Sequence, residues 1–268
     1  SKAEKGDCDA QNEYAKCFSS GNGVQKDEKQ AFNLWLKSAE SGCWKSQANL
    51  ANCYQAGSGV EKDLYKAFYW LKKASNNPNV SPKVFFQLGV YFTNGIGVQP
   101  DPIEANNYFK KAAGAGLHEA QFTLGSNYAN GIGFAQNFQQ ALYWYNLAAR
   151  QGDSEAQLRI AIAYQNGDIG LPIDIEKAKY WFIKSAEQNN INAQGLLGYL
   201  YFQQDNMERA IFWLSKAVRA GDFNSYALLG NSYLKEGKYQ NVSEGVALLR
   251  LARLKGNDEI AKYANDNL

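Results

Sequence analysis

The sequence has little of what most enzyme sites need: one histidine, one methionine and four cysteines among 268 residues. With His118 as the only histidine and no acidic cluster of fixed spacing, we expect no metal site and no catalytic triad built on histidine. We interpret His118 itself as a solvated or capping residue. The five prolines stand beside many Tyr, Phe, Trp, Asn and Gln residues. This balance is typical of a folded helical protein and not of a disordered one.

Two further absences concern partners and location. No apolar run approaches the roughly 18 residues of a membrane span. The net charge is +2 without a basic stripe, so we expect no nucleic-acid partner and no membrane insertion. The polar start, residues 1–5, resembles the tail of a helix whose beginning is missing, not a signal peptide. We therefore expect that an N-terminal segment was trimmed, which favours a periplasmic or secreted location over the cytoplasm.

All four cysteines lie near the N-terminus, at Cys8, Cys17, Cys43 and Cys53. Their spacings match no usual zinc pattern. Two interpretations remain open: buried free thiols that pack like small hydrophobic residues, or one or two disulfides formed in an oxidising compartment.

The clearest stretch of the chain is 116–152, which predicts a helical hairpin. Gly131-Ile132-Gly133 ends a first helix, and Asn137 is placed to cap a second. One such hairpin cannot bury both of its faces, so it must stack on neighbours.

Copies of this hairpin recur with a period in the mid-thirties, marked by glycine or asparagine. The spacing predicts an all-α, right-handed α-solenoid occupying 1–268 as a single domain. We expect about seven helix-turn-helix repeats at 6–41, 42–77, 78–115, 116–151, 152–188, 189–220 and 221–256, and a capping helix at 257–268.

Aligned columns support this register. A small residue in each first helix lets two helices approach closely; it recurs at Ala15, Ala51, Gly89, Gly125, Ala161, Gly198 and Gly230. An aromatic residue follows three positions later in each repeat. The second helices share an alanine column, ending with Ala247, and an N-cap column of Asp27, Asp63, Asp101, Asn137, Asp174, Asn206 and Ser243.

These columns resemble the Sel1-like repeat family, a relative of the tetratricopeptide repeats. The matching motifs are Leu-Gly-x-x-Tyr at 124–128, Gly-x-Gly-Val at 21–24, 57–60 and 95–98, Lys-Ala-x-x-Trp at 177–181 and Ala-Ala-x-x-Gly at 148–152. The resemblance implies a protein-binding scaffold, similar in role to adaptors of membrane complexes, bacterial host-interaction factors and immunity proteins against toxins. Some cysteine-rich members carry a disulfide in each repeat. Because the later repeats here have no cysteine, the penicillin-binding activity proposed for that subgroup is not expected.

No motif points to chemistry. The Gly-x-Gly loops lack the preceding strand and the Gly-Lys-Ser/Thr ending of phosphate loops, and the tryptophans fall on core columns. We therefore predict a protein that is not an enzyme, with no cofactor and no metal.

Recognition should then depend on positions where the repeats differ. Counted from the small residue, positions −2, +1 and +5 of each first helix face away from the stack and line the concave side of a solenoid. This stripe is polar in the N-terminal half and becomes more apolar in the C-terminal half. The predicted partner-binding residues are Arg159, Ile162, Asn166, Leu196, Tyr199, Gln203, Leu228 and Asn231.

The sequence thus predicts a monomeric scaffold or adaptor that binds another protein or peptide along its concave surface, possible roles including bacterial host interaction. The alternative is an immunity protein that neutralises a toxin by direct binding. An enzyme acting on the cell envelope or a small-molecule binder would require a deep pocket with a nucleophile beside a base. A structural assembly element would form a homo-oligomer that covers the concave surface.

Overall fold

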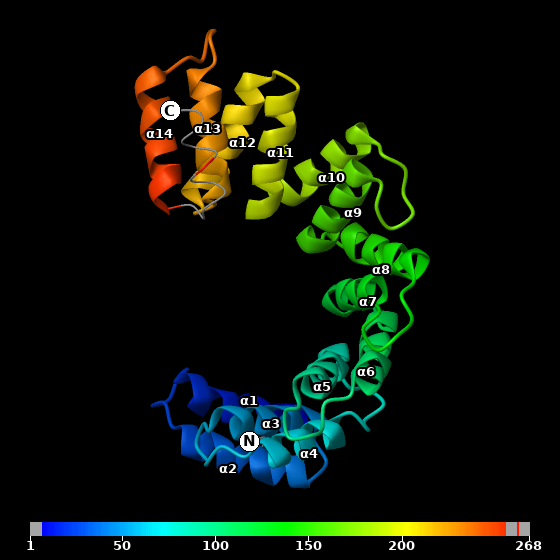
Figure 1. Cartoon of the computed structure of the whole chain (residues 1–268). Helices are drawn as coiled ribbons and strands as arrows, with labels where there is room; N and C mark the ends of the chain where they lie inside the picture. Colours follow the sequence, from blue (N-terminus) through cyan, green and yellow to red (C-terminus); the bar gives the residue numbers. More distant parts are fainter. Residues whose placement is uncertain (1–6, 256–261, 263–268) are drawn as a thin grey trace. The chain divides into compact units, whose positions relative to one another are not determined.

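The computed structural model describes residues 7–255 and 262, and these residues form fourteen α-helices and no strand. The helices divide between two compact units, 1–137 and 138–268, and each is described by itself (Figure 1). The all-α repeat architecture is confirmed. The predicted capping helix at 257–268 lies, apart from Lys262, outside the described residues.

The N-terminal unit contains seven helices that pack mainly against their neighbours in the chain. They are α1 (Cys8–Ser20), α2 (Glu28–Glu40), α3 (Trp44–Ala56), α4 (Leu64–Ala74), α5 (Pro82–Asn94), α6 (Pro102–Gly114) and α7 (His118–Asn130). Leu50, Leu71 and Leu88 are fully buried between them, with Trp35 and Tyr91 beside these leucines.

The C-terminal unit repeats this arrangement. Its helices are α8 (Phe138–Arg150), α9 (Ser154–Asn166), α10 (Ile175–Glu187), α11 (Ile191–Gln203), α12 (Met207–Arg219), α13 (Asn224–Leu234) and α14 (Val242–Lys255). Phe182, Leu197 and Leu214 are fully buried in its core.

The two glycines of each Gly-x-Gly loop have different tasks. The first ends the first helix in the left-handed region, as at Gly95 with φ +67°. Where another repeat precedes the loop, the second glycine lies against that repeat: a Cβ on Gly97 would be 1.9 Å from the carbonyl oxygen of Leu64. The loop therefore joins one repeat to the next, because only a glycine permits this approach.

The small residues of the first helices also act as predicted. A Cβ on Gly198 would lie 2.6 Å from the Leu214 side chain, and one on Gly89 would lie 2.4 Å from the Phe109 ring. These contacts confirm that a small residue is needed where the two helices of a hairpin cross.

The N-cap column is confirmed at Asp27, Asp63, Asp101, Asp174 and Asn206, whose side chains accept hydrogen bonds from first-turn amides. At Asp63 and Asp174 these bonds hold the carboxyl pKa below its usual value, the backbone N–H of Lys66 and of Lys177 respectively being the main cause.

The last repeat corrects the predicted register by two residues. Asn241 accepts a hydrogen bond from the backbone amide of Glu244, so Asn241 and not Ser243 caps α14. Gly245 accordingly takes the place expected for Ala247, and its Cβ position would overlap Leu234. The prediction failed because this repeat has lost the Gly-x-Gly loop that set the spacing elsewhere.

Each interpretation of the cysteines holds for one pair. Cys8 and Cys43 form a disulfide, which closes a loop across the first repeat. Cys17 is a half-buried free thiol and Cys53 is a buried one. Burial raises the pKa of the Cys53 thiol to about 11, so this residue acts as a small apolar side chain near neutral pH.

Buried glutamines form a second link between successive repeats that the sequence had not suggested. Each lies in the first turn of a first helix and donates a hydrogen bond to a last-turn carbonyl of the second helix before it. The pairs are Gln47 with Ala39, Gln121 with Ala113, Gln157 with Ala149 and Gln194 with Ala186. Each of these carbonyls also accepts a hydrogen bond from a backbone N–H of the turn that follows its helix, so the glutamine adds a second bond that ties the next helix to this turn.

Candidate functional site

Three successive first helices of the C-terminal unit, α9, α11 and α13, line an open groove of about 340 Å³. We call it the α9/α11/α13 groove. Its lining residues are Glu155, Leu158, Arg159, Ile162, Asn192, Gly195, Leu196, Tyr199, Asp222, Asn224, Ser225 and Leu228.

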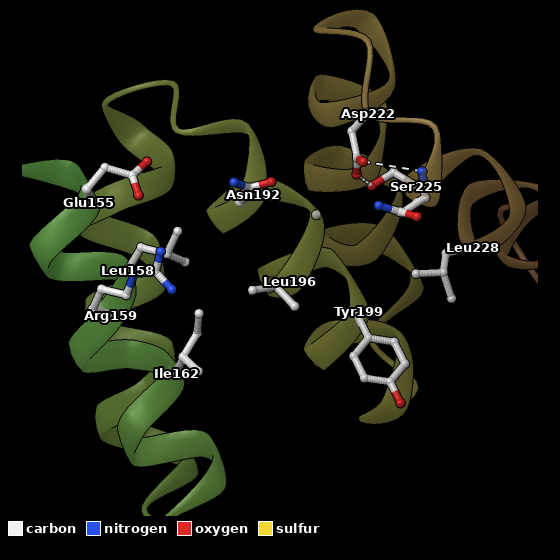
Figure 2. Close-up of a pocket in the computed structure, with 12 residues that line it drawn as sticks. Glu155, Leu158, Arg159, Ile162, Asn192, Leu196, Tyr199, Asp222, Ser225 and Leu228 are labelled. Atoms are coloured by element: carbon white, nitrogen blue, oxygen red, sulfur yellow. Dashed lines mark hydrogen bonds between the residues drawn. The ribbon is translucent and has the colours of Figure 1, made fainter. Parts of the chain in front are cut away.

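The helical period explains why these residues meet. Glu155, Arg159 and Ile162 follow one face of α9, and Asn192, Leu196 and Tyr199 follow the equivalent face of α11. Residues spaced by three and four positions lie on the same side of a helix. Figure 2 shows the α9 residues on one side of the groove and Leu228 on the other, with Leu196 between them.

The wall of the groove is aliphatic. Leu158 is 3% exposed and belongs to the core, whereas Ile162, Leu196 and Leu228 are half-buried. Together with the half-buried ring of Tyr199 they leave apolar surface open to solvent in one place. A contiguous apolar patch with a polar rim is typical of an interaction site.

The start of α13 forms one polar rim. Asp222 accepts hydrogen bonds from the backbone amide of Asn224 and from the hydroxyl of Ser225. A Cβ on Gly195 would lie 2.8 Å from a carboxylate oxygen of Asp222. Glycine at this position of α11 is therefore what allows the start of α13 to approach.

Asp222 and Ser225 place a carboxylate beside a hydroxyl, an arrangement that can activate a nucleophile. Ser225, however, is 1% exposed, so its hydroxyl is not presented to a substrate. The two bonds accepted by Asp222 instead satisfy groups in the first turn of α13.

Arg159 and Tyr199 are the groove's remaining strong donors. Arg159 is exposed and has no hydrogen bond or ion pair with any residue that the structure describes. The Tyr199 hydroxyl oxygen accepts a 2.6 Å hydrogen bond from Gln203, which leaves its proton free to donate.

Five of the eight predicted residues line the groove together: Arg159, Ile162, Leu196, Tyr199 and Leu228. The other three, Asn166, Gln203 and Asn231, lie on the same helices towards their C-terminal ends and are not part of its lining. Asn166 donates to Asp168, and Gln203 contacts the groove only through Tyr199.

Sequence reasoning missed the half of the groove that lies one turn earlier. The missed residues are Glu155, Leu158, Asn192, Gly195, Asp222, Asn224 and Ser225. Most of them precede a predicted residue by three or four positions. Extending the predicted stripe by one turn towards each N-terminus would have found all of them except Asp222, which precedes α13.

The equivalent stripe of the N-terminal unit has a different character. There, Asn49 donates to Asn12 at 2.7 Å, and Gln87 donates to Asn52 at 2.7 Å. These amides satisfy one another across neighbouring first helices. In the α9/α11/α13 groove, aliphatic side chains replace such amides. Arg159 there has no hydrogen bond or ion pair with a described residue.

Two features are absent from the described residues, a membrane-spanning helix and a metal-binding cluster. No helix found there combines the length and the apolar character of a membrane span. In the same part of the chain, no three His, Cys, Asp or Glu side chains are arranged to hold a metal ion.

Stacked helical hairpins, interlocking glycine loops and a groove on the first helices define a helical-repeat protein of the solenoid class. Within that class the Sel1 repeat matches residues 8–43, 44–79, 86–117, 118–153, 154–190 and 191–222. The chain therefore belongs to the Sel1 repeat family. Proteins of this family are generally protein-interaction scaffolds and typically not enzymes. The last helix pair, α13 and α14, lies beyond the sixth matched segment.

Solved structures agree with this assignment. A Sel1 repeat protein from Oxalobacter formigenes has 28% identity and a TM-score of 0.78, over 99% of this chain and 78% of its own. The protein c5321, a protective antigen present in uropathogenic Escherichia coli strains, has 28% identity and a TM-score of 0.56, over 96% of this chain and 63% of its own. No curated protein matches significantly.

Proposed function

We propose that this protein is an interaction scaffold whose α9/α11/α13 groove receives a segment of a partner protein. The observation that carries the proposal is the contrast between the two stripes. In the N-terminal stripe, Asn49 and Gln87 donate to side-chain amides of the neighbouring first helix, whereas apolar surface and an unpaired arginine remain open in the groove. Tyrosine and arginine are among the residue types that dominate binding energy at interfaces, where they act beside desolvated apolar surface.

The size of the groove indicates how the partner would engage it. A volume of about 340 Å³ accommodates a few side chains, whereas a stable protein complex buries about 800 Å² per partner. The partner segment would therefore anchor in the groove and extend along the neighbouring first helices. An adaptor and an immunity protein could both use this arrangement, and the identity of the partner would separate them.

Selection of peptides by the full chain tests the proposal. A displayed library of random peptides is selected on the immobilised protein, and the enriched peptides are measured by titration calorimetry. Replacing both Tyr199 and Leu228 by alanine should weaken their binding at least about tenfold, because each truncation removes an apolar anchor. Val90→Ala provides the matched control, since half-buried Val90 occupies the position of Tyr199 in the N-terminal stripe.

Equal affinity of the double variant, with its helical circular dichroism intact, would reject the groove as the binding site. Failure to enrich any peptide would count against binding of linear segments altogether.

A further inference from the structure

We infer that the partner segment presents a carboxylate next to an aliphatic side chain, and that Arg159 binds this carboxylate. The inference depends on the proposed function, and it specifies the chemistry of the partner at the same groove.

Three charged residues line the groove: Glu155, Arg159 and Asp222. Glu155 accepts a 2.6 Å hydrogen bond from the side-chain amide of Asn190. Asp222 accepts from Asn224 and Ser225. Both carboxylates thus have donors from this chain, whereas Arg159 has no acceptor among the described residues.

Glu155 and Arg159 could form an ion pair on α9 but do not. Glu155 precedes Arg159 by four residues on α9, which is the favourable order for an ion pair on a helix. Asn190 bonds to Glu155 instead, and the structure contains no ion pair between Glu155 and Arg159. The guanidinium, with its fork of N–H donors matched to a carboxylate, therefore remains available to an incoming group.

The neutral polar groups of the groove, Tyr199 and Asn192, also have hydrogen-bonding capacity left for a ligand. The Tyr199 hydroxyl already accepts from Gln203, so it can donate its proton to a ligand. The Asn192 side chain has no hydrogen-bond partner among the described residues and can also donate. Arg159 offers donors alone, Tyr199 its hydroxyl proton, and Asn192 its N–H groups beside its carbonyl oxygen, so a ligand with acceptors matches all three.

The two carboxylates of the groove would repel an acidic ligand only weakly. An acidic ligand would meet the negative charges of Glu155 and Asp222, but these residues lie at or just before the first turns of α9 and α13. The partial positive charge of a helix N-terminus offsets a carboxylate there. Leu158, Ile162, Leu196 and Leu228 supply the wall for the accompanying aliphatic side chain.

The experiment uses the tightest selected peptide with an acidic residue and an analogue in which Gln or Asn replaces that residue. Both are measured by calorimetry against the full chain and against Arg159→Gln. We expect Arg159→Gln to weaken the acidic peptide about tenfold, as for a charge-assisted hydrogen bond. The neutral analogue should bind both proteins equally, because the two changes remove the same contact.

Two further variants and one modified peptide sharpen the test. Glu155→Gln should tighten binding of the acidic peptide, because it removes a like charge; a merely structural role of α9 predicts weaker binding in both variants. Arg219→Gln, a change at an exposed arginine on α12, should have no effect. A C-terminally amidated peptide distinguishes the two carboxylate sources: unchanged binding assigns the side chain, and lost binding assigns the chain terminus.

The outcomes separate this inference from the proposed function. If Arg159→Gln binds the acidic peptide unchanged while the double Tyr199 and Leu228 variant does not bind, the carboxylate inference is wrong and the groove stands. Enriched peptides without any dependence on a carboxylate would also overturn it. If the double variant binds normally, the groove itself is rejected.

Discussion

Replacing Gly97 by alanine is expected to lower the free energy of unfolding by about 3 kcal/mol, as the sum of two costs. Gly97 has φ +66°, where an L-residue is strained. Its new Cβ would also lie 1.9 Å from the Leu64 carbonyl oxygen and 2.5 Å from the Leu64 carbonyl carbon. Backbone atoms at the start of α4 cannot rotate away as a side chain could, so the loop must move. Urea unfolding followed by circular dichroism measures the change.

The substitution Gly23→Ala is the control for this prediction. Gly23 has the same place in the first Gly-x-Gly loop and φ +73°, but nothing lies within 4 Å of its Cβ position. Gly23→Ala should therefore show only the conformational cost, about 1 kcal/mol. If both variants lose the same stability, the loop is needed for its turn alone, and the idea that it joins successive repeats is wrong.

Replacing Gln157 by leucine should cost about 2 kcal/mol, because it removes two hydrogen bonds of a buried side-chain amide. The Gln157 side chain is 4% exposed, donates to the Ala149 carbonyl and accepts from Gln188. A leucine of similar size fills the space but makes neither bond. Since Gln157 lies next to Leu158 and Arg159, amide exchange in α9 should accelerate along with the loss of global stability.

Gln165 on the same helix provides the comparison. It is half-buried, and its side chain makes no hydrogen bond with the described residues. Gln165→Leu should change stability by no more than about 0.5 kcal/mol, as is usual for substitutions away from such networks. A Gln157→Leu protein as stable as Gln165→Leu would show that the buried amide does not hold the two helices together.

The repeat register could be predicted from the sequence because each recurring residue solves a local problem. Gly198 is small because Leu214 lies against it, and Asp174 precedes α10 because its carboxylate accepts a first-turn amide. Such requirements depend on neighbours close in the chain, so they leave a visible column. The last repeat was misplaced where its loop differs, at Asn241 and Gly245.

Other features depend on distances that spacing alone does not determine. The pairing of Cys8 with Cys43, while Cys17 and Cys53 stay free, follows from how α1 meets the start of α3. The glutamine column was overlooked because a polar residue in a first turn is ordinarily solvated. Only the packed helices show that Gln47 is buried against the Ala39 carbonyl.

The candidate site was predicted in part for the same reason. Helical periodicity placed Arg159, Leu196 and Leu228 on one side of the first helices, and all three line the groove. It could not show where along each helix the groove would end. The prediction therefore included Asn166, which lies beyond it, and omitted Asp222, which enters only because Gly195 admits the start of α13.

Hydrogen–deuterium exchange of the full chain, with and without a selected peptide, shows directly whether the partner segment binds in the α9/α11/α13 groove. We expect amide exchange to slow on binding in α9, α11 and α13, at the residues around Ile162, Leu196 and Leu228. The stripe of the N-terminal unit should exchange at the same rate in both samples. Slower exchange confined to α10 and α12, or to the N-terminal unit, with α9, α11 and α13 unchanged, would contradict it.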